Sequence, residues 1–370
     1  MKKLIALIVV LVAVLTVFIG IGVKMIKDNY TEVSYAAPVE SVLIEADVDQ
    51  LPEKNIEIEN NSNQSVIEEK EKSRITISAA GDCTLGYSAK QSTWNRFDTV
   101  FKTNTPDYFF ENVRTIFEDD DLTIVNLEGP LTRLGTPVEK EFVFRGEPEY
   151  VHILTSSSVE AVNLANNHTR DYGDVGYDET QKVLKEAGIG FFGEQTVFYH
   201  TINDIRVGLI GMKGWSSDKW VKDNLTRLIS EAKLKSDLII VMFHWGVEGT
   251  YYPVAAQKDL AKHAIDEGAH LILGSHPHVI QGIEKYKERN IVYSMGNFCF
   301  GGNRNPSDKD TFIYQETFER TETGIVSVGS QVIPCRISSV ETYNDYRPTP
   351  LQGDAKRIVE ERLETYSQIE

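Results

Sequence analysis

The sequence predicts an α/β domain that follows an N-terminal membrane anchor, and three observations lead to this prediction. Short apolar runs rich in β-branched residues recur from residue 74 onward, which is typical of strands buried on both faces. Helix-like segments lie between several of these runs, and strands that alternate with helices indicate a layered α/β architecture. An unbroken apolar run from Leu4 to Val23 precedes them, and it is long enough to cross a bilayer.

The apolar run predicts a single-pass signal anchor. Met1, Lys2 and Lys3 precede it, and its length at 1.5 Å per residue matches a hydrocarbon core of about 30 Å. A cleaved signal peptide is the alternative, but its apolar region is usually only ~7–15 residues long. We expect residues 1–27 to be a cytoplasmic start and an uncleaved anchor in the cell membrane, with the rest of the chain extracellular.

The segment after the anchor is expected to be an acidic disordered spacer over residues 28–73. Residues 38–73 contain ten acidic residues, three basic residues and no aromatic residue, so they bury too little apolar surface to offset chain entropy. The whole chain has a net charge of −17 and lacks a basic block, which argues against nucleic acid as a partner. Its three cysteines are an odd number, which excludes a fully paired disulfide scaffold.

The remaining chain divides into elements by its apolar pattern. Strands are expected at residues 75–80, 122–127, 161–165, 207–212, 237–243, 270–274 and 291–296. Helices are expected at residues 107–119, 177–188, 223–235 and 253–268. Residues 74–302 therefore form the main domain, residues 303–345 add antiparallel strands at 311–318 and 324–333, and residues 346–370 are a C-terminal tail.

Polar side chains follow five of these strands, which predicts a metal site. They are Asp82, Asn126, Glu128, Asn167, His168, His244, His276 and His278. The carboxyl ends of strands form the ligand crevice of open α/β sheets. Carboxylates, imidazoles and a carboxamide are a donor set that manganese, iron or zinc accepts. We expect Asp82, Glu128, Asn167, His244, His276 and His278 to hold one or two such ions, although two surface histidines are the alternative for His276 and His278.

Further residues are expected to act beside the metal. His168 is a candidate catalytic acid, and Asp171 lies three residues on, where it would orient the ring. A structural histidine that bonds its own turn is the alternative. Arg145, Asn126 and Glu248 are candidates for substrate binding, because an arginine can clamp a carboxylate or phosphate. Cys83 beside Asp82 is a weaker candidate as a soft ligand.

Six motifs then resemble a known family. They are GDCTLG (81–86), NLEGPLT (126–132), NNHTRDYG (166–173), HWGVE (244–248), GSHPHVIQG (274–282) and YSMGNF (293–298). In this order they resemble the CapA family, called PgsA in some bacteria, which is tied to poly-γ-glutamate capsule synthesis. That family is similar to calcineurin-like metallophosphoesterases, so the resemblance implies a sandwich of two sheets flanked by helices.

The resemblance also implies roles for single residues. Asp82 would bind a first metal and Glu128 would bridge. Asn167, His244 and His276 would hold a second metal, while His278 returns to the first and His168 is the acid. The sequence departs from the phosphoesterase pattern at Thr84, where a histidine is usual, and at Glu128, which stands in place of an aspartate.

Two functions follow from the resemblance. The first is a membrane-anchored extracellular protein of capsule synthesis or export, with a metal-dependent hydrolase site for a polyanionic polymer or a phosphate ester. The second is a non-catalytic accessory subunit of a membrane polyglutamate synthase, with capsule synthase subunits as partners and a vestigial pocket.

Overall fold

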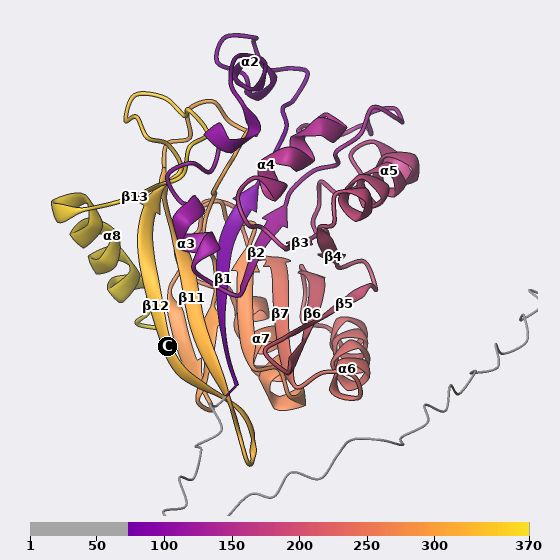
Figure 1. Ribbon diagram of the computed structural model, residues 1–370, viewed down its shortest axis with the longest axis vertical. Coiled ribbons are helices and arrows are strands. Elements are labelled where there is room, and N and C mark those ends of the chain that lie inside the picture. Colours follow the sequence, from indigo (N-terminus) through magenta and orange to yellow (C-terminus); the bar gives the residue numbers. More distant parts are fainter. Residues whose placement is uncertain (1–72, 370) are drawn as a thin grey trace, which may run out of the picture. The chain divides into compact units, whose positions relative to one another are not determined.

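The computed structural model describes residues 73–369, which form two stacked β-sheets with helices on their outer faces (Figure 1). The first sheet has the strand order β13-β12-β11-β1-β2-β3-β4, and the second has the order β5-β6-β7-β8-β10-β9. This arrangement confirms the predicted α/β class with two sheets and flanking helices.

The first sheet is parallel on one side and antiparallel on the other. β1 to β4 run parallel to one another, whereas β11 is antiparallel to β1, and β12 and β13 continue the antiparallel side. Its strands are β1 (Arg74–Cys83), β2 (Leu122–Leu127), β3 (Ala161–Asn163), β4 (Gly190–Phe192), β11 (Asp310–Thr321), β12 (Gly324–Arg336) and β13 (Thr349–Pro350).

The second sheet is built around four parallel strands, with one antiparallel strand at each edge. Its strands are β5 (Val197–Ile202), β6 (Ile205–Gly214), β7 (Leu238–Trp245), β8 (Leu271–Ser275), β9 (Ile283–Tyr286) and β10 (Arg289–Val292). The parallel strands end at the same edge, which places the polar residues that follow them together.

The main core lies between the sheets. Ile77 of β1 and Ile124 of β2 belong to the same buried cluster as Ile240 of β7 and Leu273 of β8. Side chains of a strand alternate between its two faces, so Val125 of β2 packs on the other side, in the core beneath the helices. Both faces are buried, which explains why these strands are continuous apolar runs in the sequence.

The helices cover the outer faces. A core on the outside of the first sheet includes residues of α2 (Phe97–Thr103), α3 (Arg114–Glu118), α4 (Val151–Thr155) and α5 (Gly173–Glu186). A core on the outside of the second sheet includes residues of α6 (Lys219–Lys233) and α7 (Ala255–Glu267). Two short 3-10 turns, η1 (Pro106–Tyr108) and η2 (Pro148–Tyr150), complete the helical segments.

Several segments differ from the prediction, since α2, α4, β4, β5 and β9 were not expected; two further differences have a clear physical reason. The single helix expected over residues 107–119 is replaced by η1 and the shorter α3, although Phe109, Phe110 and Phe117 are all buried as its pattern required. Residues 346–370 contain helix α8 (Gly353–Tyr366) where a tail was expected. Val359 and Leu363 lie one turn apart on α8 and are buried against the main core, which is why this short amphipathic stretch is helical.

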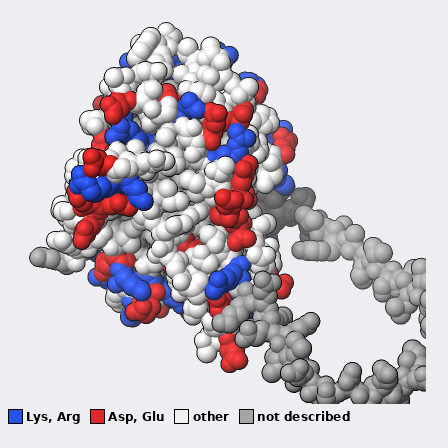
Figure 2. Space-filling model, turned by 60° about the vertical axis from the view of Figure 1, so that its left-hand side comes forward, with Lys and Arg blue, Asp and Glu red and all other residues white. Residues whose placement is uncertain are grey.

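Among residues 73–369, we find no helix with the length and apolar character needed to span a bilayer. The predicted anchor and residues 28–72 of the predicted spacer lie outside the described residues. On the face drawn in Figure 2, basic side chains lie beside acidic ones rather than in a block of one sign.

Candidate metal centre

The centre forms where the carboxyl ends of strands from both sheets meet. Asp82 near the end of β1 is hydrogen-bonded through its backbone to the segment after β10: its N–H donates to the carbonyl of Gly296 (2.9 Å), and its carbonyl accepts from the N–H of Phe298 (2.8 Å). The N–H of His276, just after β8, donates to Asp82 Oδ2 at 3.0 Å. These bonds fix the two sheets against each other at the site.

Asp82 is fully buried and ionised. Asn126 Nδ2 donates to its Oδ1 at 2.7 Å, and His278 Nδ1 lies 3.4 Å from its Oδ2. Burial raises the pKa of Asp82, but the hydrogen bond and positive charge of His278 outweigh burial and lower this pKa to about 2. The residue is therefore a carboxylate at neutral pH, as a hard metal ligand must be.

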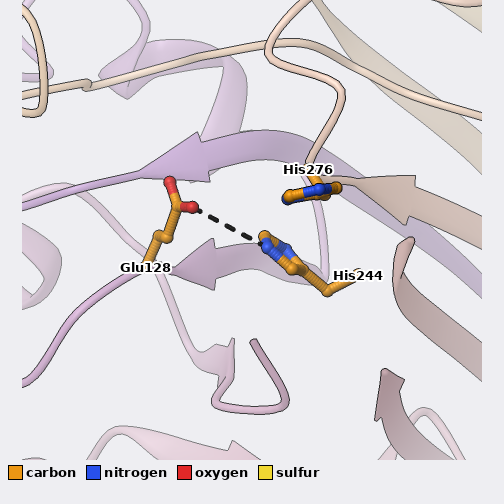
Figure 3. A group of neighbouring side chains, drawn as sticks. All are labelled: Glu128, His244 and His276. Carbon is orange, nitrogen blue, oxygen red and sulfur yellow. Dashed lines mark ion pairs between the residues drawn. The ribbon is translucent and has the colours of Figure 1, made fainter. Parts of the chain in front are cut away.

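Glu128, directly after β2, has one carboxylate oxygen without a hydrogen-bond partner. Its Oε2 accepts from Thr84 Oγ1 at 3.0 Å, whereas the buried Oε1 has no hydrogen bond. The Nε2 atoms of His244, His278 and His168 lie 3.7, 3.8 and 4.0 Å from Oε1. Burial is the largest influence on Glu128 and raises its pKa. Figure 3 shows its carboxylate facing the ring of His244, with His276 beside it.

His244 at the end of β7 faces this oxygen through Nε2 and is hydrogen-bonded at both ring nitrogens. Nδ1 lies 3.0 Å from Ser275 Oγ and 3.3 Å from Asn126 Nδ2, and Nε2 lies 2.8 Å from Asn167 Oδ1. Burial lowers the pKa of His244 and keeps its ring neutral, so one ring nitrogen carries a proton and the other offers a lone pair. Nε2 also lies 3.7 Å from Glu128 Oε1, which brings donor atoms of both sheets together.

His276 and His278 approach from the loop after β8. His276 Nδ1 is buried without a hydrogen-bond partner, and burial lowers the pKa of this histidine to about 4. His278 Nδ1 lies 2.9 Å from Asn297 Oδ1. Burial lowers the pKa of His278, but the charges of Glu128 and Asp82 raise it to about 10. In the absence of a cation, a protonated His278 thus balances part of the buried negative charge.

The donor atoms form groups that could hold metal ions. Asp82, Glu128 and His278 are one group, and Glu128, His244 and His276 are a second. Glu128 belongs to both, as the resemblance implied for a bridging carboxylate. Asn167 is exposed and reaches His244. The unpartnered Oε1 of Glu128 and the unpartnered Nδ1 of His276 fit a divalent cation, because an ion would satisfy two buried atoms that have no hydrogen-bond partner among the described residues.

His168 and Asp171 are joined as expected. His168 Nδ1 lies 2.8 Å from Asp171 Oδ2, and its ring packs on Phe144 with 4.4 Å between centroids. Lys140 was not anticipated: its Nζ lies 2.5 Å from Asp171 Oδ1 and donates to the carbonyl of Asn167 at 2.9 Å. Lys140 comes from the long loop after β2, where no periodic pattern signals a role.

The three candidates for substrate binding lie in different settings. Asn126 is fully buried, donates to Asp82 and accepts from Asn163 Nδ2 at 3.0 Å, so it holds the ligands in place rather than facing solvent. Arg145 stacks on Tyr172, with its guanidinium carbon 4.7 Å from the ring centroid. It is not among the residues that line the cavity beside the centre, which is described below. Glu248 is exposed, lines that cavity, and forms a third possible metal group with His276 and His278.

Other residues support the centre without having been assigned beforehand. Asn297 holds His278 and stands in the YSMGNF motif, so this motif could have identified it. The ring of Trp215 packs edge-on against His276, with 4.7 Å between centroids, and only its place after β6 hinted at this. Cys83 is fully buried, and burial raises the pKa of its thiol. It does not belong to any of the possible metal groups found among the described residues.

A cavity of about 270 Å³ opens beside the centre. His168 and His278 lie at the side of the cavity nearest the metal groups, and Phe142, Phe144 and Phe300 provide aromatic walls. The cavity gives a small molecule access to the candidate ligands and to the candidate acid.

Comparisons with known proteins agree with the motifs. A family model described as "Bacterial capsule synthesis protein PGA_cap" matches residues 76–302. The chain is 30% identical over 295 residues to the "Capsule biosynthesis protein CapA" of Bacillus anthracis, covering 71% of this chain and 68% of that protein. It is 29% identical over 274 residues to the "PGA biosynthesis protein CapA" of Bacillus subtilis (strain 168), covering 68% and 69%.

A more distant relative is a "Probable polyglutamine synthesis accessory protein" of Mycobacterium tuberculosis, 24% identical over 254 residues, or 59% of this chain and 66% of that protein. The family model spans more than half of the chain, and the resemblance to the CapA family is confirmed. The chain belongs to the bacterial capsule synthesis protein family PGA_cap, together with the CapA proteins.

Proposed function

We propose that this protein is a metal-dependent hydrolase of the cell surface that acts in the synthesis or export of a poly-γ-glutamate capsule. The capsule role is carried over from the family and from the printed names of the relatives. The hydrolase role rests on one observation above all: the buried Glu128 Oε1 has no hydrogen bond, and the Nε2 atoms of His244, His278 and His168 lie around it at 3.7, 3.8 and 4.0 Å.

The ligand set supports one or two divalent ions. Asp82 and His278 would hold one ion, His244, His276 and Asn167 the other, and Glu128 would contact both. When bound, such an ion would polarise the electrophilic group of the substrate and activate water. Manganese, iron and zinc all accept this mixture of oxygen and imidazole ligands.

His168, held by Asp171 beside the ligands, would transfer a proton to the leaving group. The Nδ1 proton of His168 bonds to Asp171, and this bond directs Nε2 of the same ring to the side of Glu128. As an imidazolium, with a second proton on Nε2, the ring would deliver that Nε2 proton to the leaving oxygen of a phosphate ester or of a link in a surface polymer and keep its Nδ1 proton hydrogen-bonded to Asp171. Lys140 neutralises part of the charge on Asp171 and ties the loop after β2 to Asn167.

Elemental analysis of the purified full-length protein tests the metal. We expect at least one transition metal per chain, a clear loss of occupancy in His276→Ala, and full occupancy in His263→Ala, whose ring contacts Thr226 on α6 instead. His168→Ala should keep the metal and lose hydrolysis of bis(p-nitrophenyl) phosphate, because His168 is an acid rather than a ligand in this proposal. A protein without metal, whose melting curve does not move with added manganese or zinc, would refute the hydrolase.

The second candidate is a non-catalytic accessory subunit of a polyglutamate synthase. Thr84 favours this candidate, because it stands where metallophosphoesterases carry a histidine. Its hydroxyl donates a hydrogen bond to Glu128 Oε2. The group of Asp82, Glu128 and His278 therefore has one donor fewer. If the metal is absent, co-purification with synthase subunits becomes the measurement that decides this candidate.

The location of the protein is also a proposal. The apolar run from Leu4 to Val23 after two lysines supports a single-pass anchor with the domain outside the cell. Protease added to intact protoplasts should digest the chain beyond residue 28. A chain that survives intact, while an external marker protein is digested, contradicts this topology.

A further inference from the structure

The cavity beside the metal centre is lined without a lysine or arginine. Among the described residues, its walls are the rings of Phe142, Phe144 and Phe300 with three neutral polar side chains, Asn297, Asn303 and Ser307. Its volume of about 270 Å³ is close to the lower end of ligand pockets, which start at roughly 300 Å³. A single ring-sized unit of a polymer fits such a space.

The charged groups of this cavity are acidic apart from the two histidines of the centre. Asp308 is already satisfied, because Arg362 lies 2.6 Å from its Oδ2 and the Tyr251 hydroxyl donates to the same atom at 3.0 Å. Glu248 is exposed and presents its carboxylate to the cavity. A ligand with many carboxylates would meet this charge with no lysine or arginine to pair with, and unpaired charges are costly to desolvate.

A second cavity lies next to Trp215, the residue that connects it to His276 of the centre. It has a volume of about 430 Å³ and is lined in part by Trp215 and Trp220, and Trp215 contacts the His276 ring. The side chains of Trp215 and Trp220 are large and exposed, at 49% and 73%. The one lysine lining this cavity, Lys213, has its Nζ 2.6 Å from Glu194 Oε1. Both cavities therefore combine aromatic faces with paired or acidic charges.

We propose that the two cavities bind neutral sugar units of one cell-surface glycan. The first cavity, lined by His168 and His278, would place a bond of the glycan beside the centre, and the second, lined by Trp215, would hold a further unit. Sugar rings present C–H faces that pack on aromatic side chains, and hydroxyl groups that donate to acceptors such as Glu248 and Asn297. An aliphatic chain would leave these polar groups unpaired. The proposal rests on the proposed function for the position of the bond, but not for the binding itself.

The polyglutamate chain and the glycan would then lie at different places on the protein. The polyglutamate chain would stay outside the cavities, where its charges keep their water. The glycan would occupy the aromatic cavities, so this protein would act on the linkage or the acceptor of the capsule rather than along the polyanion.

Calorimetric titration of the full-length protein tests this with three probes of four units each: a neutral N-acetylglucosamine tetramer, a γ-glutamate tetramer and tetra-alanine. We expect the sugar to bind about ten-fold tighter than either other probe, equal to about 1.4 kcal/mol. Added salt should leave its affinity unchanged, because no ion pair forms.

Substitutions at exposed aromatic residues locate the binding without disturbing the fold. Phe142→Ala and Trp220→Ala, one in each cavity, should each weaken sugar binding several-fold, while Trp94→Ala, which is 66% exposed and lines neither cavity, should not. Ser307→Arg should improve binding of the γ-glutamate tetramer by adding the missing cation.

Each outcome decides. Tighter binding of the γ-glutamate tetramer or of tetra-alanine, no sugar binding, or sugar binding that is insensitive to both aromatic substitutions overturns the proposal. Sugar binding by a protein that holds no metal would support the glycan cavities while the hydrolase fails.

Discussion

Replacing Glu128 with glutamine should stabilise the metal-free protein. Glu128 is fully buried, its Oε1 has no hydrogen bond, and burial raises its pKa. A folded-state pKa above the unfolded value means that ionised Glu128 costs stability at neutral pH. Glutamine has the same shape without the charge, and its neutral side chain leaves Asp82 and His278 as a balanced pair.

The expected change in the free energy of unfolding follows from Glu128 Oε1, the oxygen without a hydrogen-bond partner. A buried unsatisfied polar group costs about 1–3 kcal/mol, and more when it is charged. We therefore expect Glu128→Gln to raise the free energy of unfolding by about 1–3 kcal/mol when the metal is chelated. With metal, the wild type should gain about 2.7 kcal/mol at a hundred-fold excess over Kd, whereas the variant should gain little.

Urea unfolding with and without chelator measures both effects. The control is Glu179→Gln, because Glu179 Oε2 accepts from the backbone N–H groups of Arg133 and Leu134 at 2.8 and 3.2 Å. Its pKa is lowered despite burial, since Thr132 and these N–H groups bond to it, so that variant should lose stability. A Glu128→Gln protein that is less stable without metal, or that gains as much from metal as the wild type, refutes the reasoning.

Three further predictions concern the frame around the centre. Burial raises the pKa of Glu160 to about 7. The free energy of unfolding should therefore fall by about 1–2 kcal/mol, after allowing for solvent screening, as pH rises from below 4.5 through 7. Glu160→Gln, measured by denaturant unfolding at several pH values, should not show this decrease. A Cβ on Gly81 would overlap the carbonyl of Gly296 where the sheets meet, so Gly81→Ala should cost at least about 2 kcal/mol, while Gly329→Ala, with open space around it, should cost nothing in the same denaturation assay. Arg362→Met should cost about 1–3 kcal/mol, because it leaves Asp308 and Asp310 without their cation; Arg357→Met on the same helix, at an exposed ion pair, should leave the midpoint unchanged.

The sequence predicted best those parts of the fold whose environment is uniform along the chain. Strands such as β2 and β7 are buried on both faces, so apolar residues dominate them and the run stands out. The polar residues at their ends, Glu128 just after β2 and His244 near the end of β7, stand out for the same reason, since a strand end is where burial gives way to a crevice.

Segments whose environment is mixed were harder to predict. α8 buries only Val359 and Leu363, so its apolar stripe is narrow and its surroundings are charged. Lys140 comes from a loop and is placed by tertiary contacts with Asp171 and Asn167, which no local pattern encodes. The polar Asn126 was expected to face a substrate, but its place between Asp82 and Asn163 is a property of neighbouring strands.

The division of the candidate ligands between the two sheets has a consequence for when the metal site can form during folding. Asp82 and Glu128 come from β1 and β2, whereas His244, His276 and His278 come from β7 and the loop after β8, and the bond from His276 to Asp82 spans 194 positions of sequence. Neither half of the chain can therefore hold an ion with its full set of ligands before both sheets have docked. An ion with its full set of ligands could therefore bind only after the sheets have docked, and a misfolded chain with its sheets apart would lack the complete metal site.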